Sequence, residues 1–131
     1  MRNLLDNLKL HGLLRVTAVL LERAEARSSR FRQLLGEDAF VFQIATEAGT
    51  GGHFNLVDGR IRYHGRIHPA PDFAQVWRRP GDAVRVLTSP DEAELLRALD
   101  EGLCRMQGRF TVALWFNEAM KIARAGRSDR P

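Results

Sequence analysis

The chain has 131 residues and a mass of 14.8 kDa, a size that fits one domain and excludes a two-domain enzyme. Hydrophobic residues make up 44% of the sequence and charged residues 27%, so the chain is predicted to fold alone rather than to stay disordered. The net charge is +4 and the pI about 10.2, but the charge alternates in sign along the chain and forms no single basic stripe, so nucleic-acid binding is not predicted.

The cellular compartment is predicted from the short apolar runs, the charged residues between them and the cysteine content. No run approaches the roughly 20 apolar residues that a membrane-spanning helix needs. Asp6 and Lys9 interrupt the N-terminal leucines, which argues against a secretory signal. Cys104 is the single cysteine, so no intrachain disulfide forms and no oxidising compartment is needed. We therefore expect a soluble, cytoplasmic protein.

Residues 1–36 are predicted to be an N-terminal helical segment. From residue 13 to residue 24, apolar residues recur at helical spacing, at Leu13, Val16, Leu20, Leu21 and Ala24. Three earlier leucines, Leu4, Leu5 and Leu8, point more than a quarter turn away from that stripe, and Gly12 separates the two sets. Either the helix kinks at Gly12 and returns these leucines to the core, or they contact a protein partner, a second copy of the chain or, transiently, a membrane surface.

A second short helix is predicted after Ser28 and Ser29, with Gly36 as its stop. From Ala39 the apolar period changes from helical to alternating, which predicts a strand. The dipeptide Asp58-Gly59 then lies between two alternating runs, which predicts a two-residue hairpin turn and fixes its register. One face of the hairpin carries Phe54, Leu56, Ile61 and Tyr63 and is predicted to be core; the other carries His53, Asn55, Arg60, Arg62 and His64 and is predicted to be solvated.

The rest of the chain is predicted to alternate between strands and helices. Ser89 and Glu92 have the spacing of a helix-capping box, with Pro90 at the first helical position, and Gly102 ends that helix. Residues 80–88 fit a short helix, which is favoured, or a strand, because Val84 and Val86 alternate. The other predicted elements are a strand at 73–77, a helix from Ser89 to Gly102, a strand at 103–107, a final helix over 112–123 and a disordered tail at 126–131. The predicted fold class is α+β, a five-stranded antiparallel sheet with helices covering one face.

Several of these features together resemble the sterol-carrier-protein type-2 family, over residues 37–125. The resemblance is carried by the hairpin at Asp58-Gly59 followed by Arg60-Ile61, by Pro71-Asp72-Phe73 before a strand, and by the run from Gly102 to Phe110 before the last helix. It implies a sterol-carrier-like domain with an apolar cavity between the sheet and the helices.

No catalytic group of residues is found in the sequence, so we expect no enzymatic activity, no cofactor and no metal. The serines lack the flanking glycines of a nucleophile elbow. His53 and His64 lie opposite each other in the hairpin register but lack a third metal ligand, so a solvated face is the favoured interpretation. Cys104 lies in an apolar strand and is expected to be an inert core residue.

The remaining candidates are apolar. They either pack a solid core or, as the resemblance implies, line a cavity for an acyl chain, a sterol-like body or an isoprenoid lipid. The alternative function is that of an accessory or scaffold subunit that uses the same fold for protein contacts, through Leu4, Leu5 and Leu8. The candidate cavity residues are Phe40, Phe42, Ile44, Phe54, Leu56, Ile61, Tyr63, Phe73, Trp77, Leu95, Leu99, Trp115, Phe116 and Met120.

Overall fold

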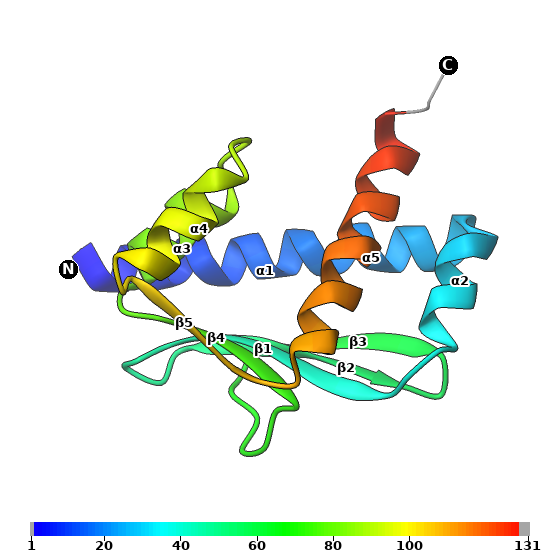
Figure 1. Cartoon of the computed structure of the whole chain (residues 1–131), viewed down its shortest axis with the longest axis horizontal. Helices are drawn as coiled ribbons and strands as arrows, with labels where there is room; N and C mark the ends of the chain where they lie inside the picture. The colour runs from blue at the N-terminus through cyan, green and yellow to red at the C-terminus, as the bar shows by residue number, and fades with distance from the viewer. Residues whose placement is uncertain (1, 129–131) are drawn as a thin grey trace.

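The computed structural model describes residues 2–128, which form five helices and one five-stranded sheet (Figure 1). This is the α+β class predicted from the sequence. In chain order the elements are α1 Arg2–Arg27, α2 Ser29–Leu35, β1 Phe40–Thr46, β2 Gly51–Val57, β3 Arg60–His64, β4 Phe73–Trp77, α3 Pro80–Leu87, α4 Ala93–Asp100, β5 Cys104–Gly108 and α5 Phe110–Ser128.

The β2–β3 hairpin has the predicted turn and register. Asp58 and Gly59 have φ values of 54° and 71°, as a two-residue turn with positive φ at both central positions requires. The strands pair antiparallel, with Leu56 opposite Ile61 and His53 opposite His64. The prediction for this segment is confirmed.

The sheet is mixed, so the prediction of a purely antiparallel sheet is wrong. The strand order is β3-β2-β1-β4-β5, and β1 pairs parallel with β4, whereas the other three neighbouring pairs are antiparallel. The reason is that β4 does not add to the free edge of β3. The chain instead leaves β3, passes β2 and β1, and places β4 on the far side of β1.

The segment 65–72 makes this crossover on the sheet face opposite the helices, where it forms the loop below the sheet in Figure 1. Polar contacts fix it to the central strands. The Gln43 side chain accepts a hydrogen bond from the backbone N–H of His68 at 2.6 Å, and the Asp72 carboxylate accepts one from the N–H of Val41 at 2.7 Å. Gln43 and His53 are buried as a result. The face that was predicted to be solvated is therefore covered at its centre.

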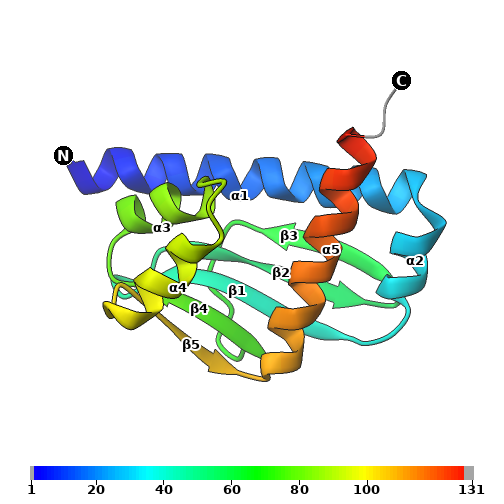
Figure 2. The same ribbon diagram turned by 45° about the horizontal axis from the view of Figure 1, so that its top comes forward.

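The helices cover the other face of the sheet, as predicted (Figure 2). Helix α1 contacts β2 and β3, α3 contacts β4, α4 contacts β5, and α5 crosses β1 and β4. Helix α5 is also held at α2, because the indole N–H of Trp115 donates to the carbonyl of Leu34 at 3.1 Å. The core therefore lies between one layer of helices and one layer of strands.

Helix α1 is continuous through Gly12, so of the two alternatives the kink that would return Leu4, Leu5 and Leu8 to the core is absent. Its buried face carries Leu10, Leu14, Ala18, Leu21 and Ala24. Val16, which was assigned to the core stripe, is 57% exposed, and Leu4, Leu5 and Leu8 are 56–64% exposed. One side of the helix thus packs on the sheet, and the opposite side presents aliphatic side chains to solvent.

Two further boundaries differ from the predicted ones. Helix α4 begins at Ala93, because Ser89 Oγ accepts from the N–H of Asp91 and the Asp91 carboxylate accepts from the N–H of Ala93, which makes a turn before the helix. Helix α5 continues to Ser128, and the rest of the predicted disordered tail, residues 129–131, lies outside the described residues. Within residues 2–128 no helix is both long and apolar enough to cross a membrane.

Candidate functional site

The structure brings the predicted apolar residues together in the layer between sheet and helices. Eight of them are buried on the helix-facing side of the sheet: Phe40, Phe42, Ile44, Phe54, Leu56, Ile61, Phe73 and Trp77. Trp115 on α5 is 8% exposed, and Tyr63, Leu95, Leu99, Phe116 and Met120 are half-buried against the same core. The alternation of apolar and polar residues along the strands thus predicted correctly which side chains face the helices.

Aromatic rings form a continuous row under α5. The rings of Phe42 and Phe116 stack with centroids 4.1 Å apart, and Phe54 lies 5.4 Å from Phe116 and 5.0 Å from Tyr63. Helix α5 makes a further ring contact with the sheet, since Phe40 meets Trp115 edge to face at 4.9 Å. These contacts pack the space between α5 and the sheet with side chains, as the solid-core alternative predicts.

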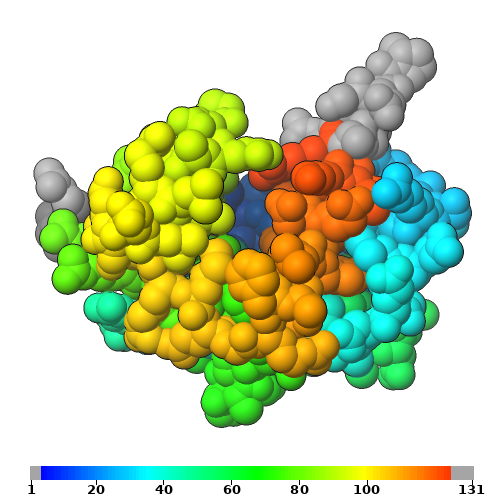
Figure 3. Space-filling model, in the orientation of Figure 1, coloured from blue at the N-terminus to red at the C-terminus, as the bar shows by residue number. Residues whose placement is uncertain are grey.

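A hollow lies beside this packed region, between α4 and α5. Figure 3 shows it as a recess between the side chains of the two helices, with α1 visible at its floor. The half-buried candidates Leu95 and Leu99 belong to α4, and Phe116 and Met120 belong to α5. The two helices that border the hollow therefore each supply partly exposed apolar side chains.

Gln75 is a polar residue on the apolar face that the sequence analysis missed. Gln75 lies between Phe73 and Trp77 on β4, and its side-chain oxygen accepts a hydrogen bond from the indole N–H of Trp77 at 3.2 Å. It is buried, and the strand alternation places it on the helix-facing side. A hydrogen-bonding group is thus present within the hydrophobic layer.

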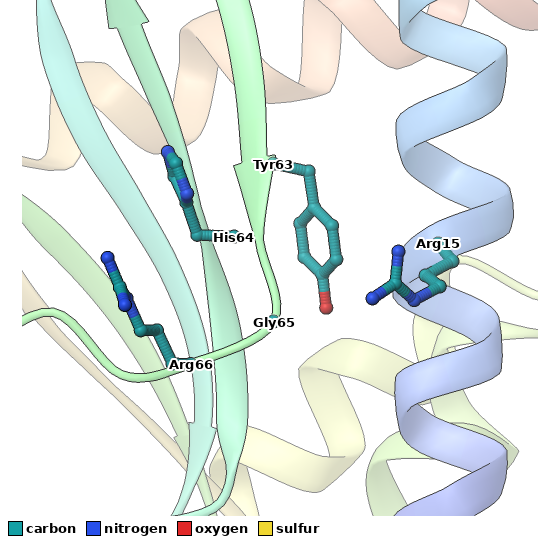
Figure 4. A pocket seen from close by; sticks show the side chains of 5 residues that line it. All are labelled: Arg15, Tyr63, His64, Gly65 and Arg66. Atoms are coloured by element: carbon teal, nitrogen blue, oxygen red, sulfur yellow. The ribbon is translucent and has the colours of Figure 1, made fainter.

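A separate polar pocket opens between the end of β3 and α1, with a volume of about 380 Å³. It is open to solvent and is lined by Arg15, Tyr63, His64, Gly65 and Arg66. Figure 4 shows that the Arg15 guanidinium and the Tyr63 hydroxyl face one another across this pocket, whereas the side chains of His64 and Arg66 point away. The Arg15 guanidinium carbon lies 5.9 Å from the centre of the Tyr63 ring, within the range of a cation–π contact.

The opposite face of the sheet carries three histidines close together. The His53 ring lies 4.9 Å from that of His64 and 5.0 Å from that of His68, measured between centroids. His53 Nδ1 is hydrogen-bonded to the carbonyl of Arg66 at 2.7 Å, and burial lowers the pKa of His53. No group of three or more His, Cys, Asp or Glu side chains in the described part of the chain is arranged to hold a metal ion.

Cys104 faces the core from β5, opposite Trp77 of the neighbouring strand. Burial raises the pKa of the Cys104 thiol to about 11, so the thiol is protonated at neutral pH. Its buried position agrees with the sequence interpretation of an inert core residue.

Two solved structures share this arrangement of helices and strands. The ubiquinone synthesis protein UbiJ-SCP2 matches with a TM-score of 0.58 and 16% identity, over 82% of this chain and 95% of that one. The sterol carrier protein domain 2 of Helicoverpa armigera matches with a TM-score of 0.50 and 16% identity, over 83% of this chain and 86% of that one. No protein-family model and no curated protein matches the sequence. The likeness is therefore one of fold.

Proposed function

We propose that this chain, which has the sterol-carrier-protein type-2 fold, binds an apolar ligand in the hollow between α4 and α5 and carries or presents it to another protein. The ligand class comprises acyl chains, sterol-like bodies and isoprenoids. A ubiquinone synthesis protein and a sterol carrier domain share the fold, and their names refer to the last two of these classes. We place the protein in the cytoplasm, because its single cysteine fits a reducing compartment.

Two observations carry the proposal: the hollow between α4 and α5, and the half-buried apolar side chains that these two helices carry. Apolar side chains that remain partly exposed beside a core gain about 25 cal/mol per Å² when a ligand removes them from water. Leu95 and Leu99 on α4 and Phe116 and Met120 on α5 are side chains of this kind. A flexible methionine among them suits a ligand of irregular shape.

We propose a carrier rather than an enzyme. Cys104 is protonated and buried, His53 is covered by the crossover, and Tyr63 has a raised pKa because it is desolvated. None of these three groups is hydrogen-bonded, within residues 2–128, to a second titratable side chain that would activate it, as general acid–base or nucleophilic catalysis requires.

The test combines detection of a ligand with a variant that fills the hollow. Native mass spectrometry of the freshly purified protein should show an added mass that organic extraction removes. A fluorescent fatty-acid or sterol analogue should bind with micromolar affinity and be displaced by natural lipids. Leu99→Trp should abolish this binding with less effect on folding, because the indole would occupy the hollow.

Leu96→Trp is the matched control. Leu96 lies on the same helix but is 68% exposed on its outer side, so this variant should bind the probe like the wild type. Equal loss of binding in both variants would indicate general damage to α4. Absence of both a copurified lipid and probe binding would refute the carrier function.

The outer face of α1 favours a second function, a scaffold role based on self-association. Leu5 and Val19, and likewise Leu8 and Val16, lie at equal sequence separations on either side of Gly12. The five positions, Leu5, Leu8, Gly12, Val16 and Val19, follow one side of the helix over about 21 Å at 1.5 Å per residue. Nothing lies within 4 Å of the position that a Gly12 side chain would take, so another helix could approach closely there.

This symmetry fits a second copy of the same chain, with the two α1 helices antiparallel across a twofold axis at Gly12. Leu5 would then meet Val19 of the partner copy, and Leu8 would meet its Val16. One helix pair is smaller than a standard interface of about 1,200–2,000 Å², so the dimer would be weak.

Light scattering at increasing concentration tests the dimer. The wild type should approach the mass of a dimer, and the double variant Leu5→Ser, Leu8→Ser should remain monomeric with near-normal stability, because both leucines are exposed. A wild-type monomer at millimolar concentration would refute self-association through this face. Leu5- and Leu8-dependent binding to lipid vesicles by a monomer would assign the face to a membrane surface instead.

A further inference from the structure

We infer that Arg15 and Tyr63 form a binding site for an anionic oxygen group, a carboxylate or a phosphate, in the pocket between α1 and the end of β3. The identification of that group as the head of an amphipathic lipid rests on the carrier function proposed above. The site differs from the apolar hollow in its residues, its charge and its place in the fold.

Arg15 supplies an unpaired positive charge. It is exposed on α1, and among the described residues it forms no salt bridge or hydrogen bond, while its guanidinium lies over the Tyr63 ring. A guanidinium has five N–H donors and accepts no hydrogen bond, so its natural partner is a carboxylate or a phosphate. The structure thus holds a cation in the pocket without an acidic side chain opposite it.

Tyr63 supplies a polar group that lacks a partner. Its hydroxyl is buried and, in the described part of the chain, forms no hydrogen bond. A buried hydroxyl without a hydrogen bond is unfavourable, and an acceptor in the pocket would satisfy it. Desolvation raises the pKa of Tyr63, so the phenol keeps its proton and remains a donor at neutral pH.

Two glycines keep the hydroxyl at the pocket. A Cβ at Gly52 would lie 2.5 Å from the Tyr63 hydroxyl, so the absence of a side chain there leaves room for the phenol. A Cβ at Gly65 would lie 3.8 Å from both the Tyr63 hydroxyl and Arg15 Nη2, so these two groups approach the same small space. That shared space is where an anion would accept from both donors.

The pocket also lies at one end of the apolar layer. The Tyr63 ring contacts Phe54, and Phe54 contacts Phe116, which belongs to the helix that borders the hollow. A ligand with its anionic head at Arg15 would bring its tail to the edge of this apolar layer, so that each part would meet matching chemistry. An amphipathic lipid is therefore the favoured source of the anion, and a free small anion is the alternative source.

The experiment compares three ligands that share a tail and differ in charge, together with one anion that has no tail. Isothermal titration calorimetry would give the Kd of dodecanoate, dodecyl phosphate, dodecanol and inorganic phosphate for the wild type, Arg15→Gln and Tyr63→Phe. Arg23→Gln is the matched control, because it removes one exposed arginine from the same helix outside the pocket.

The anionic amphiphiles should bind the wild type about tenfold more tightly than dodecanol does, as expected for charge-assisted hydrogen bonds. Arg15→Gln should remove this preference and leave dodecanol binding unchanged, Tyr63→Phe should reduce it several-fold, and Arg23→Gln should keep it. Bound anion should also raise the midpoint of the ultraviolet titration of Tyr63, since it disfavours the phenolate.

The possible failures are distinguishable. Equal binding of acid and alcohol in the wild type and in Arg15→Gln would refute the anion site and leave the carrier function intact. Arg15-dependent binding of inorganic phosphate without binding of any amphiphile would support the site, with a free anion as its ligand, and refute the carrier function. Absence of binding by all four ligands would refute both.

Discussion

Gly108→Ala should destabilise the protein by about 3 kcal/mol or more, because β5 and β4 meet at Gly108 without room for a side chain. Gly108 pairs with Phe73 and has a φ of 100°. A Cβ there would overlap the Asp72 carbonyl oxygen and lie 2.9 Å from its carbon and 3.0 Å from Phe73 Cα. Those are backbone atoms, so the clash cannot be relieved by a change of rotamer.

The magnitude follows from two contributions. Holding alanine at positive φ costs about 1–2 kcal/mol. Displacing the Asp72 carbonyl disturbs the hydrogen bond that it accepts from the N–H of Arg109 at 2.7 Å, which costs about 1 kcal/mol more, before any strain in the sheet. For a chain of this size the melting temperature should fall by roughly 10 °C.

Two other glycines are matched controls. Gly102 has a φ of 77° but nothing within 4 Å of the position that a Cβ would take, so Gly102→Ala should cost only about 1 kcal/mol. Gly12 lies inside α1 with open space around it, so Gly12→Ala should stabilise by about 0.5–1 kcal/mol. Urea unfolding followed by circular dichroism gives all three values. If Gly108→Ala and Gly102→Ala lost the same stability, the close approach of β5 to Asp72 would be wrong.

Three further predictions concern single residues. At mildly alkaline pH, Cys104 should react with a thiol reagent about a hundredfold more slowly in the folded protein than in urea, because burial raises the pKa of its thiol to about 11. Equal reaction rates in the two states would contradict the burial of Cys104. Burial lowers the pKa of His53 below 6.5, so as the pH falls the unfolded chain takes up the proton before the folded chain does. The free energy of unfolding should therefore be at its full value above about pH 6.5 and decrease below it. Urea midpoints measured against pH test this, and the same decrease in His53→Asn would exclude His53 as the cause. Gly59→Val should lower the melting temperature by several degrees, because valine does not readily adopt a φ of 71°, and an unchanged melting curve would contradict the turn.

The parts of the fold that were predictable from the sequence are those in which neighbouring residues carry the information. Asp58 and Gly59 determine a turn between strands that alternate around it, so the register and the core face of the hairpin follow from local spacing. The parallel pairing of β1 with β4 was not predictable in this way. The local sequence of residues 65–72 does not indicate that the chain passes β2 and β1 before β4 pairs with β1.

The N-terminal helix shows a second limit. Both sides of α1 carry aliphatic residues, so periodicity alone could not decide which side the sheet covers. Leu10 and Leu14 are buried and Val16 is exposed, because the position of the sheet selects the stripe. The same limit applies to the polar pocket, since Arg15 and Tyr63 are far apart in the sequence and form no motif.

Helix α5 has a consequence for how the chain folds as it is synthesised. Its Phe116 covers Phe42 and Phe54, and its Trp115 covers Phe40, so these rings on the sheet stay uncovered until α5 has left the ribosome. Up to that point the nascent chain can form its hairpin but exposes an aromatic surface that favours aggregation or capture by a chaperone. Ribosome-bound chains that stop before α5 are therefore the species in which quality control would act on this protein.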